Sequence, residues 1–190
     1  MSTTTKSPVA ETKVITGKVR FSYAHVWEAT AIDEGQKPKF SVSLLIPKSD
    51  KITIGRIQRA VEAAKQQGKA SKYGGKIPAN LKLPLRDGDE ERPDDDTYKG
   101  HYFVNALAVT RPGIVDANRD PITDKEEFYS GCYGVASVNF YPFNTSGNKG
   151  VACGLNNLMK TADGEPLGGR QSAEDDFADV EIPEEADDLL

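Results

Sequence analysis

Hydrophobic and polar residues alternate along two segments near the start of the chain, which is the period-two pattern of a half-buried β-strand. In the segment 14–26 the alternating residues are Val19, Phe21 and Tyr23 on one side and Lys18, Arg20 and Ser22 on the other. The segment 39–46 alternates more cleanly, and Pro47 ends it because proline has no backbone donor for a sheet. We therefore predict two strands here, each with one face in the core.

The period then changes from two residues to the spacing of a helix. Ile54, Ile57, Val61 and Ala64 recur at helical intervals, with Ser49 or Asp50 as the start signal and Gly68 as the stop signal. This pattern predicts one amphipathic helix over residues 52–67 that packs on the sheet. A long polar connection with many turn residues follows over 68–100.

Strand patterns return in the second half of the chain, over 101–110, 114–115, 129–141 and, after a turn, 149–158. Several strands, one inserted helix and long loops are typical of a small Greek-key barrel rather than a parallel α/β sheet. We therefore expect a mainly β fold, a barrel with an inserted helix, over residues 14–170. A disordered arm, 1–13, precedes it.

The parity of the 129–141 segment separates a core face from a face that could bind a ligand. Ala136, Val138 and Phe140 share the core face, whereas the opposite parity carries Tyr129, Tyr133, Val135, Ser137, Asn139 and Tyr141. A row of tyrosines among small polar residues suits base stacking, which contributes roughly 1–3 kcal/mol per base with little sequence preference. The alternative is that these tyrosines are half-buried sheet residues with satisfied hydroxyl groups.

Further aromatic and basic residues extend this candidate site. Tyr102 and Tyr73 are added as stacking candidates, while Trp27 fits either a core position or a stacking surface. Basic side chains give affinity through phosphates without reading sequence. The candidates for phosphate contact are Lys18, Arg20, Lys39, Lys72, Lys76 and Arg111. Scattered basic residues are also ordinary solvated surface, so the spacing alone does not establish DNA binding.

Charge is distributed very unevenly along the chain. Its formal net charge is −5, from 24 basic and 29 acidic residues, but nine of the acidic residues lie in 174–190, where no Lys or Arg occurs. Without them, 20 acidic residues face 24 basic ones, so residues 1–173 carry about +4. We expect a disordered acidic tail over 171–190 that competes with DNA for the basic domain. The alternative is a tail that serves solubility only.

The acidic tail also contains apolar residues that a protein partner could bind. The residues proposed for docking are Phe177, Asp187, Asp188, Leu189 and Leu190. An acidic segment with a terminal apolar anchor resembles the partner-docking tails of single-stranded DNA-binding proteins, although those more usually end in an aromatic residue.

Four stretches of the chain resemble one family of phage proteins. They are GKVRFSYAHVWEA, PLRDGDEERPDDDTYKGHYFVNA, YSGCYGVASVNFYPFNTSGNKGVACGLNNLMK and DGEPLGGRQSAEDDF, which together cover much of residues 17–177 in order. This family was long catalogued as a domain of unknown function and occurs in replication and recombination gene clusters. The resemblance implies a single-stranded DNA-binding protein of the T7 phage type, with an OB-like five-stranded barrel and an acidic C-terminal tail. Replication or recombination proteins are the implied partners.

Motifs for catalysis or cofactor binding are weak. The sequence has no phosphate-binding loop of the GxxxxGK(S/T) type and no zinc-ligand spacing, so we expect no catalytic residues, metal or cofactor. The acidic run from Asp87 to Asp96 is the one alternative, a metal-dependent nuclease site. Strand annealing and a purely structural interaction module also stay open, as does a homodimer. We expect a soluble protein of the infected host's cytoplasm with no membrane segment.

Overall fold

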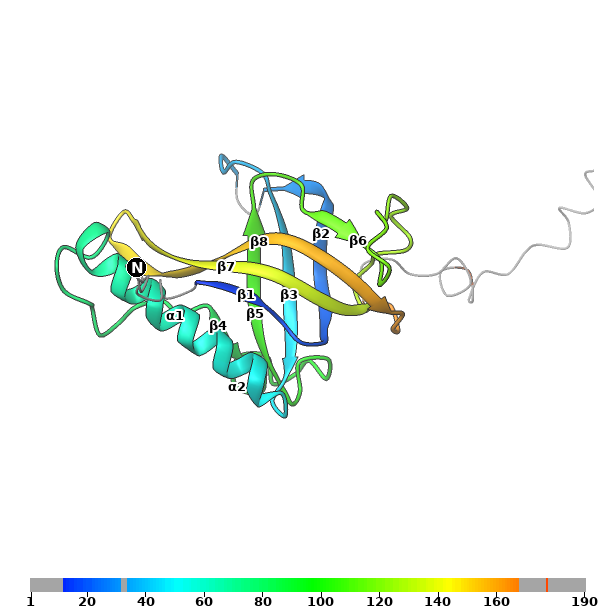
Figure 1. Ribbon diagram of the computed structural model, residues 1–190, viewed down its shortest axis with the longest axis horizontal. Coiled ribbons are helices and arrows are strands. Elements are labelled where there is room, and N and C mark those ends of the chain that lie inside the picture. The colour runs from blue at the N-terminus through cyan, green and yellow to red at the C-terminus, as the bar shows by residue number, and fades with distance from the viewer. Residues whose placement is uncertain (1–11, 32–33, 168–176, 178–190) are drawn as a thin grey trace, which may run out of the picture.

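The computed structural model describes residues 12–31, 34–167 and 177 (Figure 1). In chain order the elements are β1 (Lys13–Ile15), β2 (Val19–Thr30), β3 (Lys39–Pro47), α1 (Lys51–Ser71), β4 (Leu85–Asp87), α2 (Gly88–Glu91), β5 (His101–Ala108), β6 (Gly113–Val115), β7 (Tyr133–Thr145) and β8 (Asn148–Ala162). Neither α1 nor α2 has an apolar stretch long enough to cross a bilayer, and these are the helices of the described ranges.

Five strands close into a barrel in the order β2, β3, β5, β8 and β7, and β7 pairs back with β2. All these pairs are antiparallel except β5 with β8, which is parallel. The short strands β1, β4 and β6 pair with β7, β5 and β8 respectively. The predicted mainly β fold with an inserted helix is therefore confirmed as an OB-like barrel, in which the β7–β8 hairpin forms the longest ribbon (Figure 1).

The helix α1 begins where the sequence predicts but ends four residues later than expected. Asp50 caps it by accepting a hydrogen bond from the backbone N–H of Thr53 at 3.1 Å. Gly68 does not end the helix. A Cβ atom at this position would lie 2.6 Å from both Pro142 Cβ and the Tyr73 ring, so glycine allows the helix to approach the β7–β8 hairpin closely. The helix buries Ile54, Ile57 and the residues in register with them in the main core.

The first predicted strand is in fact two strands. The strand is interrupted around Gly17, whose backbone N–H donates to Thr53 Oγ1 at 2.9 Å beside the start of α1. β1 therefore pairs with β7, whereas β2 enters the barrel and continues to Thr30. Lys13, which we expected in the N-terminal arm, belongs to β1, and residues 1–11 lie outside the described ranges.

A second, smaller cluster lies outside the barrel and is formed by Leu45, Tyr98 and Phe103. The Tyr98 and Phe103 rings meet edge to face, with their centres 5.1 Å apart. The Tyr98 hydroxyl lies 3.4 Å from both Ser22 Oγ and Ser43 Oγ, on the outer surface of β2 and β3. This cluster holds the 88–100 segment against the barrel, where the segment becomes one wall of the site described next.

Candidate nucleic-acid interface

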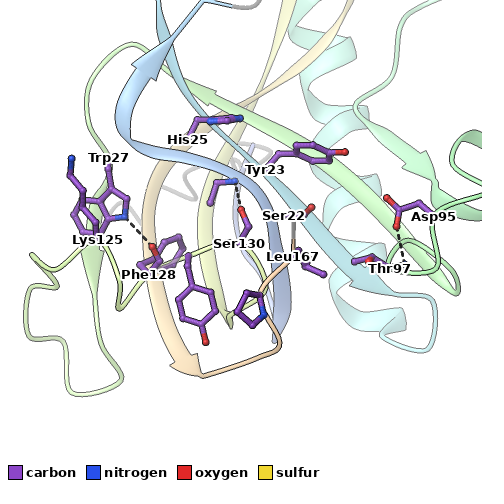
Figure 2. A pocket seen from close by; sticks show the side chains of 13 residues that line it. Ser22, Tyr23, His25, Trp27, Asp95, Thr97, Lys125, Phe128, Ser130 and Leu167 are labelled. Carbon is purple, nitrogen blue, oxygen red and sulfur yellow. Dashed lines mark hydrogen bonds between the residues drawn. The ribbon is translucent and has the colours of Figure 1, made fainter. Parts of the chain in front are cut away.

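A groove of about 670 Å³ runs over the outer face of β2 (Figure 2). Its floor is the part of β2 from Ser22 to Trp27, without Val26. Asp95 and Thr97 form one wall, and residues of the 125–130 segment form the other. Pro166 and Leu167, at the end of the described 34–167 range, complete its border. Four parts of the chain that are distant in sequence therefore meet at one open, elongated surface.

Tyr23 is the most exposed of the tyrosine, tryptophan and phenylalanine side chains that line this groove, with 52% of its surface exposed. The pairing of β2 with β3 shifts here, because two residues lie between Ser22 and His25 while one lies between their partners on β3. This is a β-bulge, and Tyr23 occupies it with φ 46°, in the left-handed region where a non-glycine residue costs about 1–2 kcal/mol. The bulge turns Tyr23 away from the core, so its assignment to the same face as Phe21 is wrong.

Arg92 stands above this tyrosine. Its guanidinium carbon lies 5.4 Å from the centre of the Tyr23 ring, and 4.9 Å and 5.6 Å from the centres of the Tyr98 and Phe103 rings. Contacts with aromatic faces hold the guanidinium in a defined place while its N–H groups can still bind a phosphate. Reasoning from sequence missed Arg92, since a lone arginine within an acidic run resembles a counter-charge.

Trp27 is both a core residue and a residue of the groove surface, the two alternatives that the sequence left open. Its side chain is half-buried, packs against the main core and lines the groove. The indole N–H donates to the carbonyl oxygen of Phe128 at 3.0 Å, which fixes the ring plane (Figure 2). Arg111, one of the predicted phosphate contacts, donates to the carbonyl oxygen of Trp27 at 2.7 Å, so it supports this part of β2.

Three residues predicted from sequence are brought together beside the groove. The Lys18 ammonium and the Arg20 guanidinium lie 5.0 Å and 5.4 Å from the centre of the Tyr133 ring. Arg20 is also committed to the fold, since it donates to the carbonyl oxygens of Gly131 at 3.1 Å and Glu165 at 2.7 Å. Lys18 is exposed and has no ion-pair partner among the described residues, which leaves it available to a phosphate.

Tyr129 precedes β7 and does not belong to its row, although its side chain lines the groove. Its hydroxyl lies 3.0 Å from both Asp163 Oδ1 and the carbonyl oxygen of Gly164. Burial raises the pKa of this hydroxyl group above its ordinary value. Together with a hydrogen bond from the Leu167 N–H to the Ser130 carbonyl oxygen at 2.9 Å, these contacts tie the 163–167 segment to the groove border.

The remaining stacking candidates do not line the groove. Tyr73 is buried, with 4% of its surface exposed, and its hydroxyl donates to the Gly150 carbonyl oxygen, so its prediction as a stacking residue is wrong. Tyr102 packs against the main core beneath the Lys48 ammonium, which lies 5.1 Å from its ring centre. Tyr141 is 40% exposed on the outer face of β7, and stacking there stays a prediction. Sequence patterns mark aromatic positions, but not the loops that cover them.

The other predicted phosphate contacts are spread over the surface. Lys72 and Lys76 are exposed beyond the end of α1, where the Lys72 carbonyl oxygen accepts a hydrogen bond from Asn144 near the tip of the β7–β8 hairpin. The groove lies at the opposite end of this hairpin. From the rise per residue of a β-strand, the two ends are roughly 40 Å apart. Lys39 is exposed at the start of β3. These residues do not gather with Lys18, Arg20 and Arg92.

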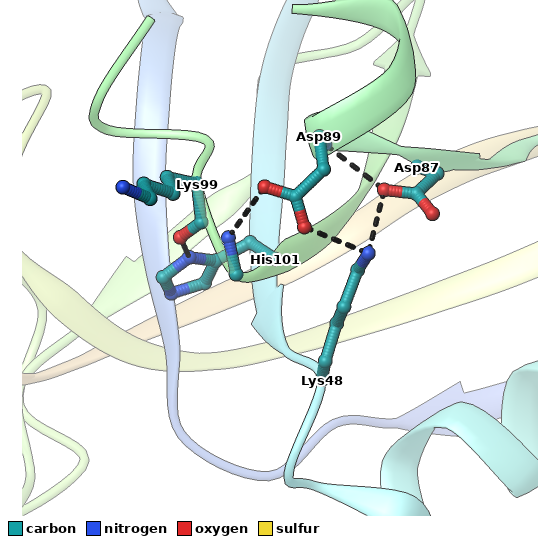
Figure 3. A network of polar contacts seen from close by, with 6 residues as sticks. Lys48, Asp87, Asp89, Lys99 and His101 are labelled. Atoms are coloured by element: carbon teal, nitrogen blue, oxygen red, sulfur yellow. Dashed lines mark hydrogen bonds and ion pairs between the residues drawn. The ribbon is translucent and has the colours of Figure 1, made fainter. Parts of the chain in front are cut away.

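The acidic run contains an ion-pair network rather than a set of free carboxylates (Figure 3). The Lys48 ammonium lies 2.8 Å from both Asp87 Oδ1 and Asp89 Oδ2. Its hydrogen bonds hold the pKa of both carboxyl groups below their ordinary values. Within the described ranges, no group of three or more His, Cys, Asp or Glu residues is placed to hold a metal ion.

The tail predictions fall almost entirely outside the described residues. Phe177 is the exception, and 66% of its surface is exposed. Asp187, Asp188, Leu189 and Leu190 are not among the described residues.

Comparison with solved structures points to the class of single-stranded DNA-binding proteins, in agreement with the OB-like fold. The single-stranded DNA-binding protein from bacteriophage Enc34, solved in complex with ssDNA, is similar to this chain with a TM-score of 0.71 and 28% identity, over 83% of this chain and 90% of that one. The gp2.5 single-stranded DNA-binding protein of bacteriophage T7 shares the fold, with a TM-score of 0.59 at 15% identity over 92% and 97% of the two chains.

Sequence comparison then gives the family. The model of the Enterobacter phage Enc34 ssDNA-binding protein family matches residues 12–190, so this chain belongs to that family of phage single-stranded DNA-binding proteins. Protein p50 of Acyrthosiphon pisum secondary endosymbiont phage 1 is 29% identical over 180 residues, which cover 91% of this chain and 96% of the relative. The resemblance inferred from the four sequence stretches is confirmed.

Proposed function

We propose that this protein binds single-stranded DNA without sequence preference along the groove over β2, during phage DNA replication or recombination in the host cytoplasm. The observation that carries the proposal is Tyr23, which is exposed at the groove in a left-handed conformation that costs free energy. Strained residues persist where the surrounding structure fixes them, and they cluster at ligand-binding sites. An exposed aromatic ring held under strain beside an arginine fits the stacking of a base.

The groove supplies the two kinds of contact that sequence-tolerant binding needs. Tyr23 and the groove-facing part of Trp27 offer aromatic surface to successive bases, and every base has a face that can stack. Arg92 and Lys18 offer positive charge to the phosphates on either side of them. Arg20 contributes charge as well, while its hydrogen bonds keep the 163–167 segment in place.

The acidic tail is proposed to compete with DNA for this groove. Leu167 lines the groove, and the first of the nine carboxylates of 174–190 follows it by only seven positions in the sequence. In this proposal residues 14–170 form the binding domain and 171–190 the tail. DNA displaces the tail, which is then free to recruit replication or recombination enzymes through Phe177 and its C-terminal residues.

Binding without chemistry is the proposed activity, in preference to a metal-dependent nuclease. Asp87 and Asp89 share one ammonium group, which holds both carboxylates and offsets one of their two negative charges. Incubation of the protein with labelled single strands and Mg²⁺ or Mn²⁺ should leave the strands intact. Metal-dependent cleavage that is lost in an Asp94/Asp95/Asp96 triple alanine variant would support the nuclease instead.

The groove can be tested by tryptophan fluorescence, because Trp27 is the only tryptophan of the chain and lines the groove. Titration with oligo-dT should quench this fluorescence, and the logarithm of the binding constant should fall linearly with the logarithm of the salt concentration. Tyr23→Ala should weaken binding, while the thermal unfolding midpoint shows that the variant is folded. Full affinity in this variant would place the DNA outside the groove.

A further inference from the structure

Lys48 ties the segment that carries Arg92 to the end of β3. Its ammonium bridges Asp87, the N-terminal cap of α2, and Asp89 within α2, at 2.8 Å each. The backbone repeats this attachment, since the Lys48 N–H donates to the Gly100 carbonyl oxygen at 3.0 Å and the Gly100 N–H donates to Asp89 Oδ1 at 3.0 Å. One lysine therefore holds both ends of the 87–100 segment.

The attachment passes directly to Arg92. The Arg92 N–H donates to the Gly88 carbonyl oxygen at 3.0 Å, so Arg92 caps the C-terminus of the same short helix that Lys48 holds. The next hydrogen bonds lead into the groove wall, from the Asp95 N–H to the Arg92 carbonyl oxygen at 3.1 Å. Lys48 itself does not line the groove.

We infer that Lys48 is a positioning residue for DNA binding: it fixes Arg92 at the groove through Asp87 and Asp89 without contacting the DNA. The inference rests on the proposed function. The competing explanation is that Lys48 is one more cation that attracts phosphates directly. The two explanations predict opposite effects when the carboxylates of Asp87 and Asp89 are neutralised.

The experiment measures oligo-dT affinity of the full-length protein by Trp27 fluorescence. Lys48→Met should weaken binding by about threefold to thirtyfold, the range of couplings carried through packed networks. Lys48→Arg, which keeps the charge and can reach both carboxylates, should restore most of the affinity. Lys51→Met removes an exposed lysine nearby that makes no ion pair among the described residues, and it should change affinity less.

Neutralising the carboxylates separates positioning from simple charge. The double variant Asp87→Asn/Asp89→Asn removes two negative charges, and asparagine still caps a helix. Direct attraction predicts tighter DNA binding, whereas positioning predicts weaker binding. Glu90→Gln removes one charge from the same helix without touching the network and is the matched control. Tighter binding by the double variant would overturn the inference.

A double-mutant cycle with Arg92→Met distinguishes failure of this inference from failure of the proposed function. If Lys48 acts through Arg92, Lys48→Met should cause little further loss in the Arg92→Met background. Fully additive losses would show that Lys48 acts independently and overturn the inference. If Arg92→Met alone left the affinity unchanged, the proposed groove itself would be wrong. Thermal midpoints verify that every variant is folded. We expect them to be folded, because the cluster of Leu45, Tyr98 and Phe103 still anchors the 87–100 segment.

Discussion

The Arg92 guanidinium lies 5.4 Å from the centre of the Tyr23 ring, so a residue of the acidic connection stands directly over a bulge of the second strand. Sixty-nine positions separate them in the sequence. The pair places a stacking surface next to a cation that cannot lose its charge at neutral pH.

Replacing Tyr23 with glycine should separate binding from stability. The loss of one stacked base is expected to weaken oligo-dT binding by roughly 1–3 kcal/mol. Glycine adopts a positive φ without strain, so the free energy of unfolding should be retained. Fluorescence titration and urea unfolding measure the two quantities. Tyr141→Ala, an exposed tyrosine away from the groove, is the control; a larger loss of affinity in the control would favour the β7 row instead.

Tyr73→Phe should lower stability without changing DNA affinity. The variant loses only the buried hydroxyl that donates to the Gly150 carbonyl oxygen, at a cost of about 1 kcal/mol in the free energy of unfolding. Chemical denaturation measures this cost. Weaker oligo-dT binding in a fully folded variant would return Tyr73 to the DNA interface.

The protein should become less stable in acid, because protonation of Asp163 removes its ion pair with Lys160. The Lys160 ammonium, 2.6 Å away, and the Tyr129 hydroxyl hold the pKa of this carboxyl group below its ordinary value of 3.8. The stabilisation is therefore complete above that value and is lost as the pH falls through the lowered pKa. Asp163→Asn should unfold more easily than the original protein at about pH 7, and the difference should shrink as the pH falls below 3.8. A difference that persists unchanged in acid would mean that the ion pair is not its source.

Deleting residues 174–190 should tighten binding to oligo-dT at low salt, because the deletion removes nine carboxylates that start seven positions after the groove residue Leu167 in the sequence. The gain should shrink as salt screens the attraction between tail and domain. Equal affinities of the full-length and shortened proteins at low salt would contradict competition by the tail. A pull-down of replication enzymes with both proteins tests recruitment separately.

The sequence predicted those parts of the fold that local pattern determines. The alternation of Val42, Leu44 and Ile46 and the helical spacing of Ile54 and Ile57 both place buried residues correctly, because strand and helix periods follow from backbone geometry. The bulge at Tyr23 could not be predicted from such a pattern. One extra residue reverses which face the following side chains occupy, and nothing in an alternating pattern reveals it.

Only part of the candidate site could be predicted from the sequence, because local pattern determines only some of its contacts. Lys18, Arg20 and Tyr133 meet because β2 pairs with β7, which strand parity could suggest. Arg92 comes to lie over Tyr23 through a contact between segments that are distant in the chain, which no local pattern indicates. Tyr73 failed as an exposed candidate because it is buried beside α1, and Tyr102 is half-buried next to Lys48; burial of this kind depends on tertiary packing.

The groove border includes residues from Ser22 to Leu167, so the binding surface is complete only when segments far apart in the chain have come together. A nascent chain that has emerged only as far as β7 lacks β8, the strand that joins β5 to β7 and closes the barrel. The binding surface therefore forms only after almost the whole chain has left the ribosome. Once it has formed, a ligand that binds the native state alone adds RT ln(1 + [L]/Kd) to stability. Exposed single strands would thus protect newly made copies of this protein from unfolding at the moment when those strands need cover.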